Sequence, residues 1–200
     1  MSQIRRICVY CGSGSGRDPD FATAARKLGQ TLAKNGIGLV YGGGSVGLMG
    51  ELANSVLDHG GQVTGIIPEF LANREHMMRR GKLVRVRDMH ERKQQMFDHA
   101  DAFVALPGGI GTLEEVVEQM TWAQLGRHQK PILLANIKGF WDPLLRLFEH
   151  MDQMAFIHSA NLFKYYVADA IDDVLPTLAE AAAQSAEAQK AMAPEVAGRM

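Results

Sequence analysis

The stretch from Pro107 to Glu115 holds the residues best suited to chemistry: a proline and three glycines, then a threonine and two glutamates. The apolar run Phe103 to Leu106 leads into it and a helical pattern follows, which predicts a strand, a glycine turn and a helix start. Glycines let a backbone approach a ligand closely, and the free N–H groups at a helix start carry the positive end of its dipole. Such a turn can hold a phosphate.

The same stretch has a purely structural alternative. Thr112 and Glu115 have the T-x-x-E spacing of a capping box, in which Glu115 would only return to the Thr112 backbone N–H. The proline and the glycines favour anion binding, because a capping box needs none of them. A glycine loop alone is a weak signal, so both interpretations stay open at this point.

Two more glycine-rich turns follow predicted strands. Ile7 to Cys11 ends in a Gly-Ser-Gly-Ser-Gly turn at residues 12–16, and Gly38 to Tyr41 runs into three glycines at 42–44. Loops at the carboxyl ends of parallel strands converge on a ligand crevice, so we expect the three turns to meet at a nucleotide or sugar phosphate. The first turn lacks G-x-G-x-x-G spacing and no G-x-x-x-x-G-K-[ST] occurs, which disfavours NAD binding and P-loop ATP hydrolysis.

The rest of the chain alternates strand and helix patterns. Further strands are predicted at residues 62–67, 82–87, 131–135 and 163–167, and helices at 19–34, 48–57, 89–99, 112–125, 142–154 and 170–188. Asp18, Asp88 and Asp142 are expected to cap helices, and Pro176 to kink or split the last one. The charged residues 69–81 have no clear period and are expected to form a surface connection or a lid.

This alternation predicts an α/β fold, doubly wound, with a mostly parallel sheet and helices on both faces. The 200 residues, 46% of them hydrophobic, suit a single domain, which we place at residues 1–188, with a disordered tail at 189–200. The formal charge of -1 gives no global attraction to nucleic acid or to an acidic membrane. The chain has no apolar run of about 20 residues and no signal-peptide pattern in its first residues, so we expect a cytoplasmic protein.

Cys8 and Cys11 form a C-x-x-C that could suggest redox chemistry or half of a zinc site. A strand would point the two side chains to opposite faces, and no second pair completes four ligands. We therefore expect buried free thiols and no metal site.

Several motifs together resemble one known family. They are Cys11-Gly12-Ser13, Tyr41-Gly42-Gly43-Gly44, Gly47-Leu48-Met49-Gly50, Met89-His90-Glu91-Arg92-Lys93 and the stretch Pro107 to Glu115. They are similar to the LOG, or "Lonely Guy", cytokinin riboside 5′-monophosphate phosphoribohydrolases over about residues 5–180. The resemblance implies a Rossmann-like fold, a homodimer, no cofactor, and hydrolysis of the bond between an adenine-type base and ribose 5-phosphate. The family has also carried the label lysine decarboxylase, but no lysine here has a setting that suggests a pyridoxal Schiff base.

The resemblance makes Arg92 and Glu115 the catalytic pair. A carboxylate beneath the sugar would stabilise the positive charge that develops on the ring, and the guanidinium, which stays protonated, would stabilise charge and position the phosphate or the leaving base. Glu114 points about 100° away on the helix and is a poor second carboxylate. The substrate-binding residues that the resemblance implies are Ser13, Gly43, Met89, Lys93, Gly108, Gly109, Gly111 and Thr112.

Substrate and function class both have alternatives. The substrate is a nucleoside monophosphate, either a cytokinin nucleotide or AMP. A non-catalytic nucleotide or cofactor carrier could use the same crevice, but it would gain little from Glu115 beside a phosphate. A dimeric scaffold with purely structural turns would show no rise in melting temperature with nucleotide. The candidate dimer interface is the helix at 112–125, through Val116, Val117, Met120 and Trp122.

Overall fold

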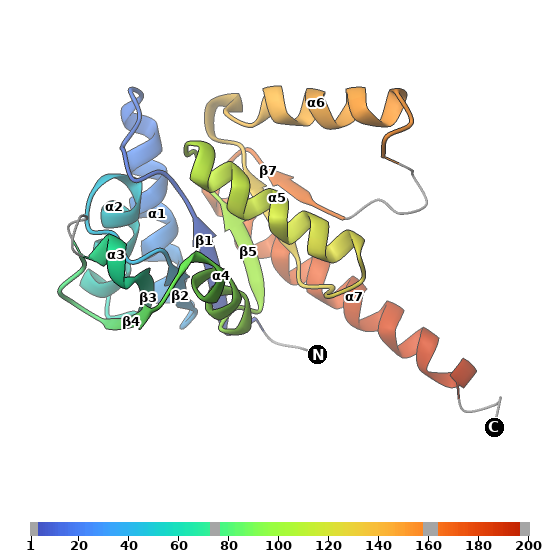
Figure 1. Cartoon of the computed structure of the whole chain (residues 1–200), viewed down its shortest axis with the longest axis horizontal. Coiled ribbons are helices and arrows are strands. Elements are labelled where there is room, and N and C mark those ends of the chain that lie inside the picture. Colours follow the sequence, from blue (N-terminus) through green and yellow to red (C-terminus); the bar gives the residue numbers. More distant parts are fainter. Residues whose placement is uncertain (1–3, 73–76, 158–163, 197–200) are drawn as a thin grey trace.

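Parallel pairing joins seven strands into one sheet in the computed structural model, which describes residues 4–72, 77–157 and 164–196 (Figure 1). The strands are β1 (Arg6–Tyr10), β2 (Gly38–Tyr41), β3 (Val63–Pro68), β4 (Lys82–Val86), β5 (Ala102–Ala105), β6 (Ile132–Ala135) and β7 (Tyr166–Ala168). The α-helices are α1 (Pro19–Lys34), α2 (Gly47–Asp58), α3 (Glu69–Ala72), α4 (Met89–Asp98), α5 (Ile110–Gln124), α6 (Asp142–Gln153) and α7 (Val174–Val196). Two short 3-10 helices, η1 (Ile137–Gly139) and η3 (Ile171–Asp173), complete the described elements.

The sheet has the strand order β4-β3-β2-β1-β5-β6-β7, and every pairing is parallel. From β1 the chain first builds outward through β2, β3 and β4, and then returns to add β5 on the other side of β1. The order therefore reverses between β1 and β5, which makes the carboxyl ends of these two strands the expected ligand crevice.

Helices cover both faces of the sheet, as predicted. One apolar cluster joins α1, α2 and α7 to the sheet, and a second joins α4, α5 and α6 to its other face. Strand β1 contributes side chains to both clusters, because Ile7 and Val9 pack on one face of the sheet while Cys8 and Tyr10 pack on the other. The α/β, doubly wound prediction is confirmed.

Two of the three predicted helix caps are confirmed. The Asp18 carboxylate accepts a hydrogen bond from the Asp20 N–H at 2.9 Å, and that of Asp88 accepts one from the Glu91 N–H at 2.8 Å. The prediction for Asp142 was wrong, because Trp141 occupies the cap position and the Asp142 carboxylate accepts from the Asn136 side-chain amide instead.

Pro176 neither kinks nor splits the last helix. It is the third residue of α7, where the missing N–H would have no intrahelical partner anyway. Strand β7 is an edge strand, as expected, but its described part starts at Tyr166, and Phe163 lies outside the described residues. The disordered tail at 189–200 stays a prediction.

Both cysteines are free and buried, and they belong to the two different clusters. Burial raises the pKa of each thiol well above its ordinary value, so neither is a reactive thiolate. In the described part of the chain, no helix has the length and apolar character needed to cross a membrane.

Candidate active site

Backbone hydrogen bonds tie the three glycine turns together at the crevice. The Gly12 N–H donates to the Pro107 carbonyl at 3.1 Å, which joins the turns after β1 and β5. The Met49 N–H donates to the Gly12 carbonyl at 3.3 Å, which joins the turn after β1 to the start of α2. The convergence that the topology predicted is therefore present.

One group of glycines is required by close backbone approach. A Cβ at Gly47 would collide with the Ser13 carbonyl, and one at Gly108 would collide with the Thr112 side chain. Gly43 is buried with a φ of +84°, a backbone conformation that favours glycine. The resemblance placed Gly43 and Gly108 at the substrate, but packing already explains why both are glycine.

A second group has no such reason to be glycine. A Cβ at Gly14, Gly109 or Gly111 would meet no atom within 4 Å, and none of the three has a positive φ in the left-handed region. Open space above a glycine at a helix start is what a closely approaching ligand requires. These positions form the best candidate phosphate cradle.

The start of α5 excludes the capping box. Gly109 is the N-cap, no side chain caps the helix, and Thr112 lies three residues after the N-cap, inside the first turn. The first turn of α5 carries no acidic residue, so its free N–H groups and positive dipole end are available to an anion.

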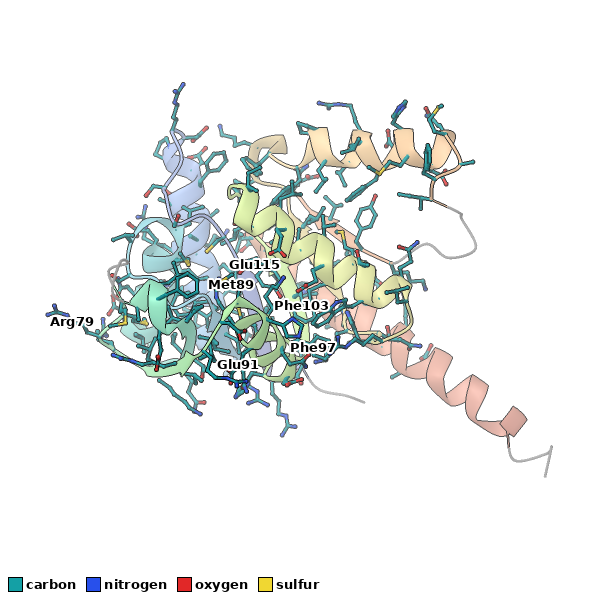
Figure 2. The ribbon with its side chains drawn as sticks, viewed as in Figure 1. Arg79, Met89, Glu91, Phe97, Phe103 and Glu115 are labelled. Carbon is teal, nitrogen blue, oxygen red and sulfur yellow. The ribbon has the colours of Figure 1, made fainter. Side chains whose placement is uncertain are left out.

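Arg92 and Glu115 meet, as the resemblance implied. Arg92 Nη1 lies 3.2 Å from Glu115 Oε1, and the two side chains are only 12% and 10% exposed. Helix α4 supplies the arginine and α5 the glutamate, and Figure 2 shows Glu115 close to Met89 in the first turn of α4. Arg92 Nε also donates to the Ile66 carbonyl at 3.2 Å, which fixes the guanidinium.

Burial dominates the electrostatics of Glu115. It raises the pKa of the carboxyl above its ordinary value, although the charge of Arg92 opposes the shift. A carboxylate with a raised pKa beside a fixed cation is typical of acid–base and charge-stabilising sites.

Sequence reasoning missed a role for Gly42. A Cβ at this position would collide with the Arg92 guanidinium, so the glycine makes room for the catalytic candidate. The signal that could have found it is the run of three consecutive glycines at residues 42–44, which is longer than a turn requires.

Lys93 forms ion pairs with two carboxylates of α5. Its Nζ is 2.6 Å from Glu114 Oε1 and 2.8 Å from Glu118 Oε1, both on α5. The substrate contact that the resemblance implies for Lys93 stays a prediction, while in the free chain its charge is paired with two carboxylates. Glu114 and Glu118 are four residues apart on one helix face, a spacing that could have indicated a shared cation.

The remaining predicted residues surround the pair. Met89 is half-buried, with its Sδ 3.7 Å from Arg92 Nη1, and Ser13 is exposed in the turn after β1. Part of the segment expected to be a surface connection or lid packs on the β2 turn instead. Met78 is buried and its N–H donates to the Gly43 carbonyl at 3.2 Å, while residues 73–76 lie outside the described part.

An open parallel sheet with glycine turns gathered at its switch point defines a Rossmann-like α/β protein with a candidate anion site. The family model described as "Possible lysine decarboxylase" matches residues 49–178. The chain is 48% identical, over 90% of its length and 79% of the relative's, to the Oryza sativa protein "Probable cytokinin riboside 5'-monophosphate phosphoribohydrolase LOG4". It is 49% identical, over 78% of the chain and 73% of the relative, to the Arabidopsis thaliana LOG3 protein named for the same activity. The chain belongs to this LOG family of the lysine decarboxylase-like proteins.

The fold is shared with more distant proteins. The Moco carrier protein from Chlamydomonas reinhardtii superposes with a TM-score of 0.69 at 20% identity, over 91% of this chain and 99% of that one. A molybdenum cofactor binding protein from Rippkaea orientalis gives 0.64 at 21% identity, covering 90% and 98% of the two chains. At this identity the likeness shows the fold alone.

The open glycines give a direct test of the cradle. We expect Gly111→Ala to leave the melting temperature unchanged or slightly raised, since a Cβ meets nothing and alanine favours a helix interior. Gly109→Ala should lower it slightly, because alanine is a poorer N-cap residue than glycine. Both should weaken AMP binding by about tenfold or more, or about 1.4 kcal/mol, because the Cβ would stand where the phosphate lies. Calorimetry measures both quantities, with Gln124→Ala at the far end of α5 as control. AMP binding unchanged in both glycine variants would exclude the cradle.

Proposed function

We propose that this chain hydrolyses the N-glycosidic bond of adenosine 5′-monophosphates, releasing the free base and ribose 5-phosphate. The observation that carries the proposal is the buried pair of Arg92 and Glu115 beside the uncapped start of α5. The site thus offers an anion cradle and a dry carboxylate within one crevice. The names of the relatives support N6-substituted cytokinin nucleotides as substrates, and AMP offers the same phosphate and sugar.

The cradle and the carboxylate would act on different parts of the nucleotide. With the phosphate bound at Gly109 and Gly111, the ribose would lie toward Glu115, one turn further along α5. Breaking the bond between ribose C1′ and the base nitrogen leaves its electron pair on the base and positive charge on the sugar. Glu115, as the carboxylate, stabilises that charge. Water then adds to C1′, Glu115 accepts its proton, and the base takes up a proton in turn.

Arg92 serves as a fixed cation in this mechanism. A guanidinium does not release a proton in the working pH range, so Arg92 is no general acid. Its contact with Glu115 and its hydrogen bond to the Ile66 carbonyl hold the carboxylate in one orientation. Its charge also favours the ionised form of Glu115, which the mechanism requires.

The name lysine decarboxylase has no chemical support at this site. A Schiff-base lysine is activated by a lowered pKa. Lys93 is half-buried, and this partial burial alone would lower its pKa, but its hydrogen bonds to Glu114 and Glu118 raise the pKa overall. The pKa of Lys130 is lowered by burial, but this residue precedes β6 and so belongs to the opposite edge of the sheet.

A nucleotide or cofactor carrier is the second candidate function. It is favoured by the open cradle, which by itself requires no catalysis. A carrier function does not explain the buried carboxylate, because Glu115 beside a phosphate would weaken nucleotide binding by charge repulsion. The hydrolase therefore accounts for more of the site.

We further propose a homodimer formed through one stripe of α5. The helix exposes Ile110 and Val117 at 81% and 37%, about 20° apart around its axis, and Leu125, which directly follows the helix, is 77% exposed. Val116 and Met120, which sequence analysis assigned to the interface, are buried in the chain's own core and cannot contribute. Trp122 is half-buried, with the Arg127 guanidinium 3.8 Å above its ring.

Product analysis tests the hydrolase. We expect the wild type to release base and ribose 5-phosphate from AMP or isopentenyladenosine monophosphate, as measured by chromatography. Glu115→Gln and Arg92→Ala should each lower kcat by about 10²–10³-fold, the usual cost of removing one charge-stabilising group. Lys27→Met, which breaks an exposed ion pair with Asp172, is the control. No base release while both nucleotides still raise the melting temperature would establish the carrier instead.

The raised pKa of Glu115 predicts the pH dependence. Activity needs the carboxylate, so kcat/KM should fall with decreasing pH, with a midpoint above the ordinary glutamate range. Because the folded pKa exceeds the unfolded one, the contribution of Glu115 to stability should fall as pH rises between the two values. Glu115→Gln should lack this part of the pH dependence in denaturant titrations. A midpoint at or below the ordinary glutamate value would mean that Arg92 outweighs burial.

Light scattering after gel filtration tests the dimer. The wild type should show twice the mass of one chain, and Val117→Lys should show the monomer mass because a charge would enter an apolar contact. Leu147→Lys, on α6 and 45% exposed in the free chain, should remain dimeric. Dissociation by Leu147→Lys alone would place the interface on α6, and a monomeric wild type would exclude the dimer.

A further inference from the structure

Lys93 makes a contact that the proposed mechanism does not use. It follows Arg92 on α4, and its two partners, Glu114 and Glu118, flank Glu115 on α5. The side chain of Lys93 is 17% exposed and that of Glu118 is 22% exposed, so this ion pair is shielded from most solvent. An ion pair with this degree of burial is not an ordinary surface contact.

Two cations face three carboxylates across this helix contact. Arg92 is paired with Glu115, and Lys93 with Glu114 and Glu118. Within the described residues, Glu118 Oε2 is buried and has no hydrogen-bond partner. Without Lys93, both Glu114 and Glu118 would lose their paired cation, and Arg92, at the preceding position of α4, would be the neighbouring cation that they attract.

The geometry of the contact also limits rotation. Successive residues on a helix point about 100° apart, so the two ion pairs join α4 and α5 in two different directions. The two pairs together therefore restrain the rotation of one helix against the other more than either pair alone. At the other end of this contact, Phe97 packs edge-on against Trp122 with ring centroids 5.3 Å apart.

We propose that Lys93 is a positioning residue, which occupies Glu114 and Glu118 so that Arg92 stays on Glu115. This inference rests on the proposed function, because it concerns how the catalytic pair is held. It differs from the phosphate contact that the resemblance implied for Lys93. Hydrogen bonds to two carboxylates also raise the lysine pKa despite burial, so Lys93 keeps its charge at the pH values where the pair must act.

The kinetic test breaks the contact from both sides. Lys93→Met and Glu118→Gln should each lower kcat by between about 10-fold and 100-fold, as expected when a catalytic group is misplaced. The KM for AMP, and the Kd for AMP measured by calorimetry in the Glu115→Gln background, should change less than about threefold, because no substrate contact is lost. Lys93→Arg should restore most of kcat, since its guanidinium can donate to both carboxylates. Lys27→Met is the matched control, a lysine–carboxylate pair on α1.

Two kinetic results would overturn the proposal. A raised KM and Kd in Lys93→Met with kcat unchanged would make Lys93 a substrate contact. An unchanged kcat in Glu118→Gln would show that the partner carboxylate does not matter.

An NMR measurement needs no activity and separates this inference from the proposed function. The Arg92 Nε–H donates to the Ile66 carbonyl, and its NMR chemical shift should change in folded Lys93→Met and Glu118→Gln but not in Lys27→Met. If the wild type released no base, the proposed function would fail, and a shift in both variants would still support the positioning role. An unmoved Arg92 signal in both would overturn it.

Discussion

A guanidinium and a carboxylate lie 3.2 Å apart between α4 and α5, and both are nearly removed from water. Desolvation of two charges costs several kcal/mol for each ion and is offset only when the geometry is good and other hydrogen bonds assist. The surroundings meet both conditions. The Ile66 carbonyl of β3 accepts a hydrogen bond from the guanidinium, and the absence of a side chain at Gly42 leaves room for the guanidinium. Much of the architecture around the crevice can be understood as support for this one contact.

Glycine has two separate uses in the same crevice. Gly47 and Gly108 let three loops pack backbone against backbone, so their replacement would disturb the protein itself. Gly109 and Gly111 face open space, so no contact within the free protein requires the absence of a side chain there. The phosphate that we propose at the start of α5 would supply such a requirement. The fold and the binding event therefore impose different constraints on residues only one or two positions apart.

Local pattern was sufficient for the fold, because a βα repeat specifies strand, turn and helix within a few residues of one another. It was sufficient for Asp18 and Asp88 as caps, but not for Asp142, since Asn136 competes for that carboxylate from outside the helix. The resemblance, rather than periodicity, brought Arg92 and Glu115 together. It could not place Lys93, because a sequence does not show which neighbouring helix a side chain will face. Apolar residues also occur on several faces of α5, so the sequence did not show which of them pack into the core of the chain and which stay exposed.

The two ends of the sheet show how an all-parallel fold can stop in solvent. Strand β4 forms one edge, where Lys82 and Arg85 are exposed among apolar neighbours, and β7 forms the other with only three residues. A row of unpaired backbone groups can pair with a strand of another chain, and a charged or short edge strand makes such pairing unfavourable. The charges of β4 protect one edge of the sheet, and the short length of β7 protects the other. Neither edge therefore offers a long uncharged row of backbone groups on which a strand of another chain could extend the sheet.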